Sequence, residues 1–308
     1  MDKKVKKKKV NVFAIAIAVL LALYMLSMVV SLFWVLMTTV KDAGEYKYGA
    51  AFFEGGLAKS NTIWFPKMGI TFENYVIAFQ NFVLEGDGEG LQKSYNIFAQ
   101  FVNSFLYSGG CALTVTLSSC VMGYATARFK FRLSNIIYSF VLISLALPIV
   151  GAMPSEIAVA DSLGIFDTFP GIWIMRASFL NTYFLIFYAQ FKMIPKDYTE
   201  AAKIDGASSF GVMVKIIFPL AMGTITTVFV LAFIFYWNDF QIPMVYLPSY
   251  PVAALGMYKF SVLTDPDEIN HIPVRLAGIC LMALPIVVFY GIFNRKLNVN
   301  LSVGGIKG

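Results

Sequence analysis

The 308-residue sequence is 58% hydrophobic and only 14% charged, whereas an average soluble domain is about a quarter charged. This composition excludes a disordered chain, and three cysteines are too few for a disulfide scaffold. The net charge of +6 would suit nucleic-acid binding only with a solvated basic face, for which the composition leaves little room. The sequence therefore predicts an integral membrane protein whose basic residues set its orientation.

The first apolar segment follows a lysine-rich start and carries no charged residue from Val10 to Val40. It is about twice as long as the apolar region of a signal peptide, which is roughly 7–15 residues. We therefore expect a basic cytoplasmic segment over 1–10 and an uncleaved membrane helix over 11–40. The polar segment 41–96 is expected to form a small subdomain outside the membrane.

Five further apolar segments are each long enough to cross a bilayer core, which takes about 20 residues per helix. Together with the first helix they predict an all-α integral membrane protein with six transmembrane helices. Its core membrane domain covers 97–293 and a cytoplasmic tail follows over 294–308. The five predicted spans are residues 97–127, 135–153, 172–193, 216–238 and 275–293.

Basic residues predict the orientation of these spans. If the N-terminus is cytoplasmic, the cytoplasmic segments hold sixteen of the 24 Lys and Arg residues but four of the 18 Asp and Glu residues. Lys and Arg are enriched on the cytoplasmic side of membrane proteins. With six spans, both termini are therefore expected in the cytoplasm.

The residues that metal and nucleotide chemistry would need are scarce. Histidine occurs once, at His271, and a zinc site usually needs several His, Cys or acidic ligands. Cys111, Cys120 and Cys280 lie in apolar segments without a CxxC pair and are expected to be buried. A GxxxxGK[ST] phosphate loop is absent from the sequence. We expect neither a metal, a cofactor nor a catalytic residue in this chain.

A short group of aromatic and polar residues ends the fifth predicted span. It consists of Tyr236, Trp237, Asn238 and Asp239. Such rings and hydrogen-bonding groups suit contacts to a sugar, and they equally suit an aromatic belt at the membrane surface. The group is a candidate for the substrate pathway, and both interpretations stay open.

The segment between the fourth and fifth spans, residues 193–220, predicts two short helices joined by a bend. Pro195 stands where a helix can begin, and Asp197 and Glu200 fall in its first turn, where negative charge is favoured. Lys203 is spaced to pair with Glu200. Gly206 interrupts this helix. The second helix is expected to be capped by Ser208 or Ser209 and to bend near Pro219.

This segment resembles the EAA motif of ABC importer permeases. The six-span layout resembles the binding-protein-dependent, type I importer permeases, and the tail resembles MalG-type subunits of carbohydrate importers. The resemblance covers most of 97–308 but not 41–96. It is carried by Glu200-Ala201-Ala202, Asp205-Gly206-Ala207, Ile216 and Phe218-Pro219, with the tail Gly304-Gly305-Ile306-Lys307-Gly308.

The resemblance implies that loop 193–220 docks into a cleft on a cytoplasmic ATPase. Glu200 would pair with a basic group there, Ala201 and Ala202 would pack into the cleft, and Gly206 would allow the bend. The implied coupling residues are Glu200, Ala201, Ala202, Lys203, Asp205, Gly206 and Ala207. Gly304, Gly305 and Lys307 would reach the ATPase interface, and the loop 240–274 would enter the sugar site of a docked binding protein.

The resemblance also implies the function and the partners. The chain would be the permease subunit of an ATP-driven importer of sugars, specifically oligosaccharides, in the bacterial cytoplasmic (inner) membrane, and not itself an enzyme. ATP and Mg²⁺ would be bound by a partner ATPase dimer. The other partners would be a MalF-like sister permease, an extracytoplasmic sugar-binding protein and membrane lipids, and not nucleic acid.

Three alternatives remain at this point. An importer permease for a non-sugar solute, such as a polyamine or an anion, would share the EAA pattern. A membrane-embedded lipid-modifying enzyme would need clustered His, Asp or Glu near the bilayer surface. A self-contained secondary transporter would show broken helices and ionisable residues at the membrane midplane. The last two leave loop 193–220 unexplained.

Overall fold

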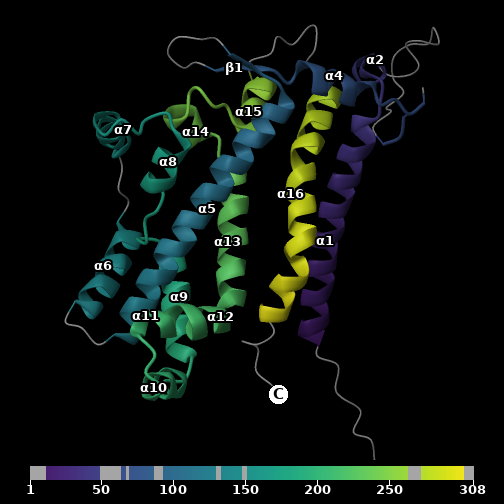
Figure 1. Ribbon diagram of the computed structural model, residues 1–308. Helices are drawn as coiled ribbons and strands as arrows, with labels where there is room; N and C mark the ends of the chain where they lie inside the picture. The colour runs from purple at the N-terminus through teal and green to yellow at the C-terminus, as the bar shows by residue number, and fades with distance from the viewer. Residues whose placement is uncertain are drawn as a thin grey trace, which may run out of the picture. The chain divides into compact units, whose positions relative to one another are not determined.

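The computed structural model describes residues 12–48, 64–66, 69–86, 93–129, 133–147, 151–262 and 272–301. Within these ranges the chain is helical apart from one short hairpin (Figure 1). It divides into two compact units, Met1–Asn81 with Leu263–Leu281 and Phe82–Val262 with Met282–Gly308. The segment 1–10, His271 and the tail residues Gly304, Gly305 and Lys307 lie outside the described residues.

Three described helices are long and apolar enough to cross a membrane: Ile15–Thr39, Ile97–Arg128 and Ile272–Ile292. A fourth is counted if the bent pair Ser209–Leu220 and Met222–Trp237 forms one span. The chain therefore has the helical membrane-protein fold that its composition predicts.

The first unit contains α1 (Val12–Thr39), α2 (Ala43–Tyr48), α4 (Glu73–Asn81) and the beginning of α16 (Ile272–Leu301). Helix α1 has nearly the limits expected from its uncharged sequence. α16 continues as a helix through Pro285, because neighbouring groups in membrane helices can satisfy the carbonyl that proline leaves free.

Helix α4 covers the C-terminal end of α1 with hydrogen bonds. The buried Asn74 amide donates to the carbonyl oxygens of Thr39 at 2.8 Å and Lys41 at 2.6 Å. These carbonyls would otherwise lack partners at the helix end. Lys41 itself is fully buried, and this burial lowers its pKa while the nearby Glu45 carboxylate opposes the shift.

Two three-residue strands open the second unit, a feature that the all-α prediction missed. β1 (Leu84–Gly86) pairs antiparallel with β2 (Lys93–Tyr95). Strands this short contain too few residues for an alternating pattern to be recognised in the sequence. Asn96 follows β2 and caps the next helix by accepting a hydrogen bond from the backbone N–H of Ala99.

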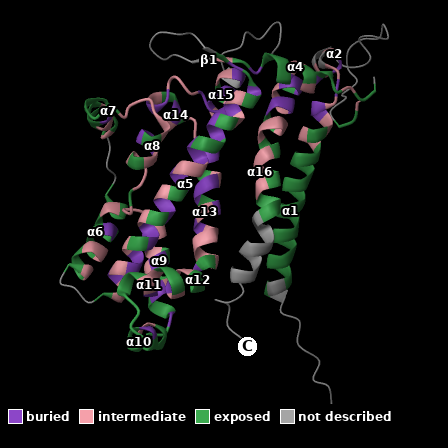
Figure 2. Cartoon of the chain, in the orientation of Figure 1, coloured by how far each residue is buried: buried purple, intermediate pink, exposed green. Residues whose placement is uncertain are grey.

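Helix α5 (Ile97–Arg128) is the centre of the second unit. It packs against α8 (Phe169–Met175), α9 (Thr182–Met193), α13 (Met222–Trp237) and α15 (Ala253–Val262). Buried positions follow α5 along its length (Figure 2). Many of them are small, which allows helices to approach closely in a membrane. Examples are Ser104, Ser108, Cys111, Ala112, Ser119 and Cys120.

The third predicted span, 135–153, was too long. The structure has α6 (Ser134–Ala146), a helix of 13 residues, and a separate α7 (Met153–Ser162). The backbone at Leu147 is extended, with φ −95° and ψ 120°. Leu147 precedes Pro148, and a residue before proline is disfavoured in the helical conformation. The proline therefore ends α6.

The fourth predicted span, 172–193, was wrong as a continuous helix. It is divided between α8 and the 12-residue α9. Asn181 starts α9, because its side chain accepts a hydrogen bond from the backbone N–H of Phe184 at 3.2 Å. Asparagine is a favoured helix cap, so Asn181 could have predicted the start of a new helix. The prediction missed it because the flanking residues are apolar and favour one continuous span.

Candidate functional site

Loop 193–220 begins with α10 (Asp197–Ile204), two residues after Pro195. Asp197 and Glu200 lie in its first turn and Lys203 in its last, as the sequence predicts. These positions place negative charge at the positive end of the helix dipole. The pairing of Glu200 with Lys203 is not observed. An ion pair elsewhere in the same unit joins Arg176 and Glu156 at 3.0 Å.

The bend after α10 has the geometry of a Schellman motif. The N–H of Gly206 donates to Lys203 at 3.1 Å, and the N–H of Ala207 donates to Ala202 at 2.9 Å. Gly206 has φ +79°, in the left-handed region that glycine adopts without a steric penalty. The interruption at Gly206 is therefore confirmed, and the structure shows its cause, the left-handed backbone of this residue.

A second helical segment follows the bend. Ser208 caps it by accepting a hydrogen bond from the N–H of Gly211 at 3.1 Å. The segment comprises α11 (Ser209–Val212), a π-helical turn η1 (Met213–Ile217) and α12 (Phe218–Leu220). It then bends by 74° into α13. The bend near Pro219 was predicted, whereas the π-turn was not.

One face of this loop is anchored in the protein. Ala202, Val212 and Ile217 are buried in a cluster that includes Tyr124 of α5 and Phe191 of α9. The Arg128 guanidinium also donates a hydrogen bond to the carbonyl of Ile194 at 2.8 Å, which ties the end of α5 to the start of the loop. The loop is therefore attached to two membrane helices.

The other face is exposed. Of the seven coupling residues named from the sequence, only Ala202 is buried. The structure adds three large apolar side chains that were not predicted: Ile204 is 87% exposed, Phe210 71% and Tyr198 50%. Large exposed apolar patches are found at interaction sites of proteins, so these three side chains are candidates for contact with a partner. The sequence signal that could have identified them is the presence of large apolar residues in the mainly polar segment 196–210.

A cavity of about 190 Å³ lies between this loop and the end of α5. Glu200 and Lys203 line it, together with Arg128 and Tyr124 of α5. Glu200 and Lys203 therefore have open space beside their side chains.

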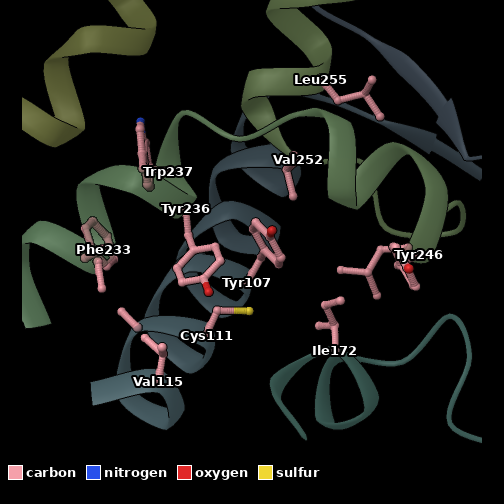
Figure 3. Close-up of a cluster of buried hydrophobic side chains, with 13 residues drawn as sticks. Tyr107, Cys111, Val115, Ile172, Phe233, Tyr236, Trp237, Tyr246, Val252 and Leu255 are labelled. Carbon is pink, nitrogen blue, oxygen red and sulfur yellow. The ribbon is translucent and has the colours of Figure 1, made fainter. Parts of the chain in front are cut away.

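The candidate pathway residues at the end of α13 are largely engaged within the chain. Tyr236 and Trp237 are buried in a hydrophobic cluster with Tyr107 (Figure 3). Asp239 accepts a hydrogen bond from the Tyr107 hydroxyl at 2.8 Å. Asn238 is exposed, so it is the member of the group whose side chain is most accessible.

In the described ranges, no group of three or more His, Cys, Asp or Glu residues is arranged to hold a metal ion. The same ranges contain Cys111 and Cys120 as buried free thiols and Cys280 as a half-buried one. Loop 193–220 is thus a bent helix pair with one buried and one exposed face.

Residues 119–298 match the family described as binding-protein-dependent transport system inner membrane component. The match includes the whole of loop 193–220. The chain belongs to this family. It is a permease subunit of a binding-protein-dependent ABC importer, a multi-pass protein of the inner membrane, and the ATPase of such an importer is a separate subunit. Catalysis is therefore not the task of this permease.

Similar proteins include several permeases of sugar importers. The trehalose transport system permease SugB of Mycobacterium tuberculosis is 29% identical, over 68% of this chain and 78% of SugB. The arabinooligosaccharides permease AraQ of Halalkalibacterium halodurans is 28% identical, over 78% of this chain and 84% of AraQ. The starch degradation products permease AmyC of Thermoanaerobacterium thermosulfurigenes is 27% identical, over 92% and 95%.

A solved structure has the same fold. The crystal structure of a bacterial ABC transporter involved in the import of the acidic polysaccharide alginate matches with a TM-score of 0.73. The alignment covers 95% of this chain and 99% of the other at 19% identity. The fold is therefore that of an ABC importer permease.

Proposed function

We propose that this permease imports a sugar, and specifically an oligosaccharide, by transmitting the closure of an ATPase dimer to its membrane helices through loop 193–220, the coupling loop. The observation that carries the mechanism is the bent helix pair, anchored on one face and exposing Ile204, Phe210 and Tyr198 on the other. The relatives named for trehalose, arabinooligosaccharides and starch products support the substrate class.

Docking would use both the charged and the apolar parts of the exposed face. Ile204 and Phe210 would be buried in the ATPase cleft, and Glu200 would meet a basic group at its edge. Ala201 and Ala207 are small and exposed, so the partner surface can approach the backbone closely. Ala202 packs into this chain's own cluster, so its role would be to hold α10 in place.

The anchored face of the coupling loop would transmit the movement of α10 to the membrane helices. Force applied to α10 reaches α5 through the Tyr124 cluster and the Arg128–Ile194 hydrogen bond. It reaches α9 through Phe191 in the same cluster. Alternating access requires two global states whose balance ATP shifts through differential binding. The coupling loop would link that balance to the orientation of α5 and α9.

The proposed topology has six spans, α1, α5, α6, α9, α13 and α16, with both termini cytoplasmic. α6 and α9, at 13 and 12 residues, are about 18–20 Å long, short of a hydrocarbon core about 30 Å thick. They would cross the membrane together with the short helices α7 and α8 that adjoin them in the chain. The coupling loop, segment 1–10 and the tail residues Gly304, Gly305 and Lys307 would then share the cytoplasmic side.

On the opposite side, the segment 240–274 with α14 (Gln241–Tyr246) and α15 would contact the sugar-binding protein. Asn238 would offer hydrogen bonds to the passing sugar. A sister permease would complete the pathway. The alternative substrate is a polyamine or an anion. The coupling of the ATPase to the membrane helices through loop 193–220 would be the same for either substrate.

Uptake measurements test this proposal. In the native host, deletion of the chain should abolish uptake of one labelled oligosaccharide class while polyamine and inorganic-anion uptake continue. Re-expression should restore uptake, and the purified complex should contain an ATPase, a second permease and a binding protein. Normal oligosaccharide uptake with loss of polyamine or anion uptake would overturn the substrate class.

A further inference from the structure

A second cavity, of about 530 Å³, lies where the end of α5, the start of α6 and the last turn of α9 meet. Three basic side chains line it, Arg128, Lys192 and Lys196, and no acidic side chain is found among its described lining residues. These described residues give the cavity a formal charge of +3. Figure 1 shows the three helices converging near the end that carries α10 and α11.

Buried donors without partners lie in the wall of this cavity. Thr126 is 3% exposed, and its hydroxyl has no hydrogen-bond partner. The Nε–H of Arg128 is likewise buried without a partner, although the same guanidinium donates to Ile194. Leaving a buried polar group unsatisfied costs about 1–3 kcal/mol. The preference for an anionic ligand therefore comes from the three basic side chains of the lining, and the unpaired donors of Thr126 and Arg128 lie behind the cavity surface.

The start of α6 adds to this preference. Its first residues, Ser134 and Asn135, line the cavity. The helix has 13 residues, and its N-cap residue Leu133 makes no side-chain hydrogen bond to the first N–H groups. A helix N-terminus favours an anion through these N–H groups and through the helix dipole.

Aromatic and apolar neighbours place the cavity at the membrane surface. The Lys192 ammonium lies 4.6 Å from the centre of the Tyr188 ring, and Tyr138 lies against Tyr188 with ring centroids 4.6 Å apart. Tyrosine and lysine are typical of the interface between bilayer and water. On α6, Ile136 is 61% exposed and Phe140 56% exposed, which provides an apolar surface beside the charged one.

We propose that this cavity binds the phosphate group of an anionic phospholipid of the inner leaflet, with its acyl chains along the exposed apolar surface of α6. Basic pockets between membrane helices on the cytoplasmic side suit such headgroups. The proposal rests on the cytoplasmic orientation of the coupling loop. Arg128 and Lys196 line both this cavity and the one beside Glu200, so the headgroup would also steady the base of the coupling loop.

The test is lipid binding to the purified, delipidated transporter complex, measured by native mass spectrometry with phosphatidylglycerol and with phosphatidylcholine. Phosphatidylglycerol should bind preferentially. Lys192→Gln should weaken its binding about fivefold and Lys192→Gln with Lys196→Gln about 25-fold, since each cation near the surface contributes on the order of 1 kcal/mol. The matched control is Lys215→Gln, an exposed lysine of η1 outside the cavity lining, which should leave binding unchanged.

Equal binding of the two lipids, or equal binding to the wild type and both variants, would overturn the proposal. Competition with inorganic phosphate distinguishes a lipid headgroup from free phosphate as the bound anion. Displacement of the lipid at millimolar phosphate would assign the site to free phosphate instead. Because the readout is binding and not uptake, this result is independent of whether the transported solute is a sugar.

Discussion

The Tyr107 hydroxyl on α5 donates a hydrogen bond of 2.8 Å to the Asp239 carboxylate, 132 residues later in the chain. The other carboxylate oxygen of Asp239 accepts hydrogen bonds from the backbone N–H groups of Gln241 and Ile242, at 3.0 and 3.2 Å. One side chain thus connects α5, the end of α13 and the start of α14.

We expect Tyr107→Phe to destabilise the second unit by about 1–3 kcal/mol, because hydrogen bonds to charged groups are stronger than neutral ones. Asp239→Asn should have a similar effect, and the double variant should cost less than the sum of the two. Thermal unfolding of the purified complex measures all three. Strictly additive losses would show that the two side chains do not interact.

The hydrogen bonds of Asn74 lead to a second prediction, on the stability of the contact between α4 and the end of α1. The buried amide of Asn74 donates to the carbonyls of Thr39 and Lys41, so Asn74→Ala removes both hydrogen bonds that join α4 to the end of α1. The expected cost is about 2–3 kcal/mol, seen as faster proteolysis between α1 and α4.

Asn81 provides the matched control for Asn74. It is exposed on the same helix, and its amide donates only to Ile77 within that helix. Asn81→Ala should change proteolysis little. If both variants are cleaved at the same rate, the attachment of α4 to α1 does not depend on Asn74.

The sequence predicted those features that single residues determine locally. The limits of α1 follow from its uncharged run, and the bend of the coupling loop follows from Gly206 and the Ser208 cap. The first signal is a property of one continuous segment, and the other two act within one helical turn. Local rules therefore sufficed for them.

Other features depend on contacts that the sequence does not display. The break between α8 and α9 lies inside an apolar stretch, where hydrophobicity alone predicts one span. The burial of Trp237 and the exposure of Ile204 are set by packing against distant segments. Both residues are apolar, and only the tertiary structure separates a core side chain from a docking one.

Ile204 should be a major contributor to ATPase docking. It is 87% exposed in this chain, so its burial would come entirely from the partner. Ile204→Ala should weaken ATPase association about tenfold, a typical loss for a well-buried interface residue. Pull-down of the ATPase at graded concentrations measures this change.

The control for Ile204 is a change of shape without a change of polarity. Ile204→Leu preserves the apolar area and should retain most of the affinity, whereas Ile204→Asp should abolish association. Equal association of all three variants would remove Ile204 from the docking surface.

Substitutions of Gly206 test the effect of backbone geometry alone, without new side-chain contacts. A Cβ atom at this position would meet no atom within 4 Å, so a substitution acts only through the φ of +79°. Gly206→Ala should cost about 1–2 kcal/mol for the left-handed conformation, and Gly206→Asn less, because asparagine tolerates that region. Gly206→Pro fixes φ near −65° and removes the N–H that donates to Lys203.

Sugar uptake and coupled ATPase activity should therefore fall in the order glycine, asparagine, alanine and proline, with proline inactive at equal membrane levels. Gly109→Ala is the matched control, since a Cβ there also meets nothing within 4 Å but the residue lies inside α5 without a positive φ. It should transport normally. Full activity of Gly206→Pro would mean that the bend does not transmit force, because proline cannot adopt the φ of +79° that Gly206 has in the bend.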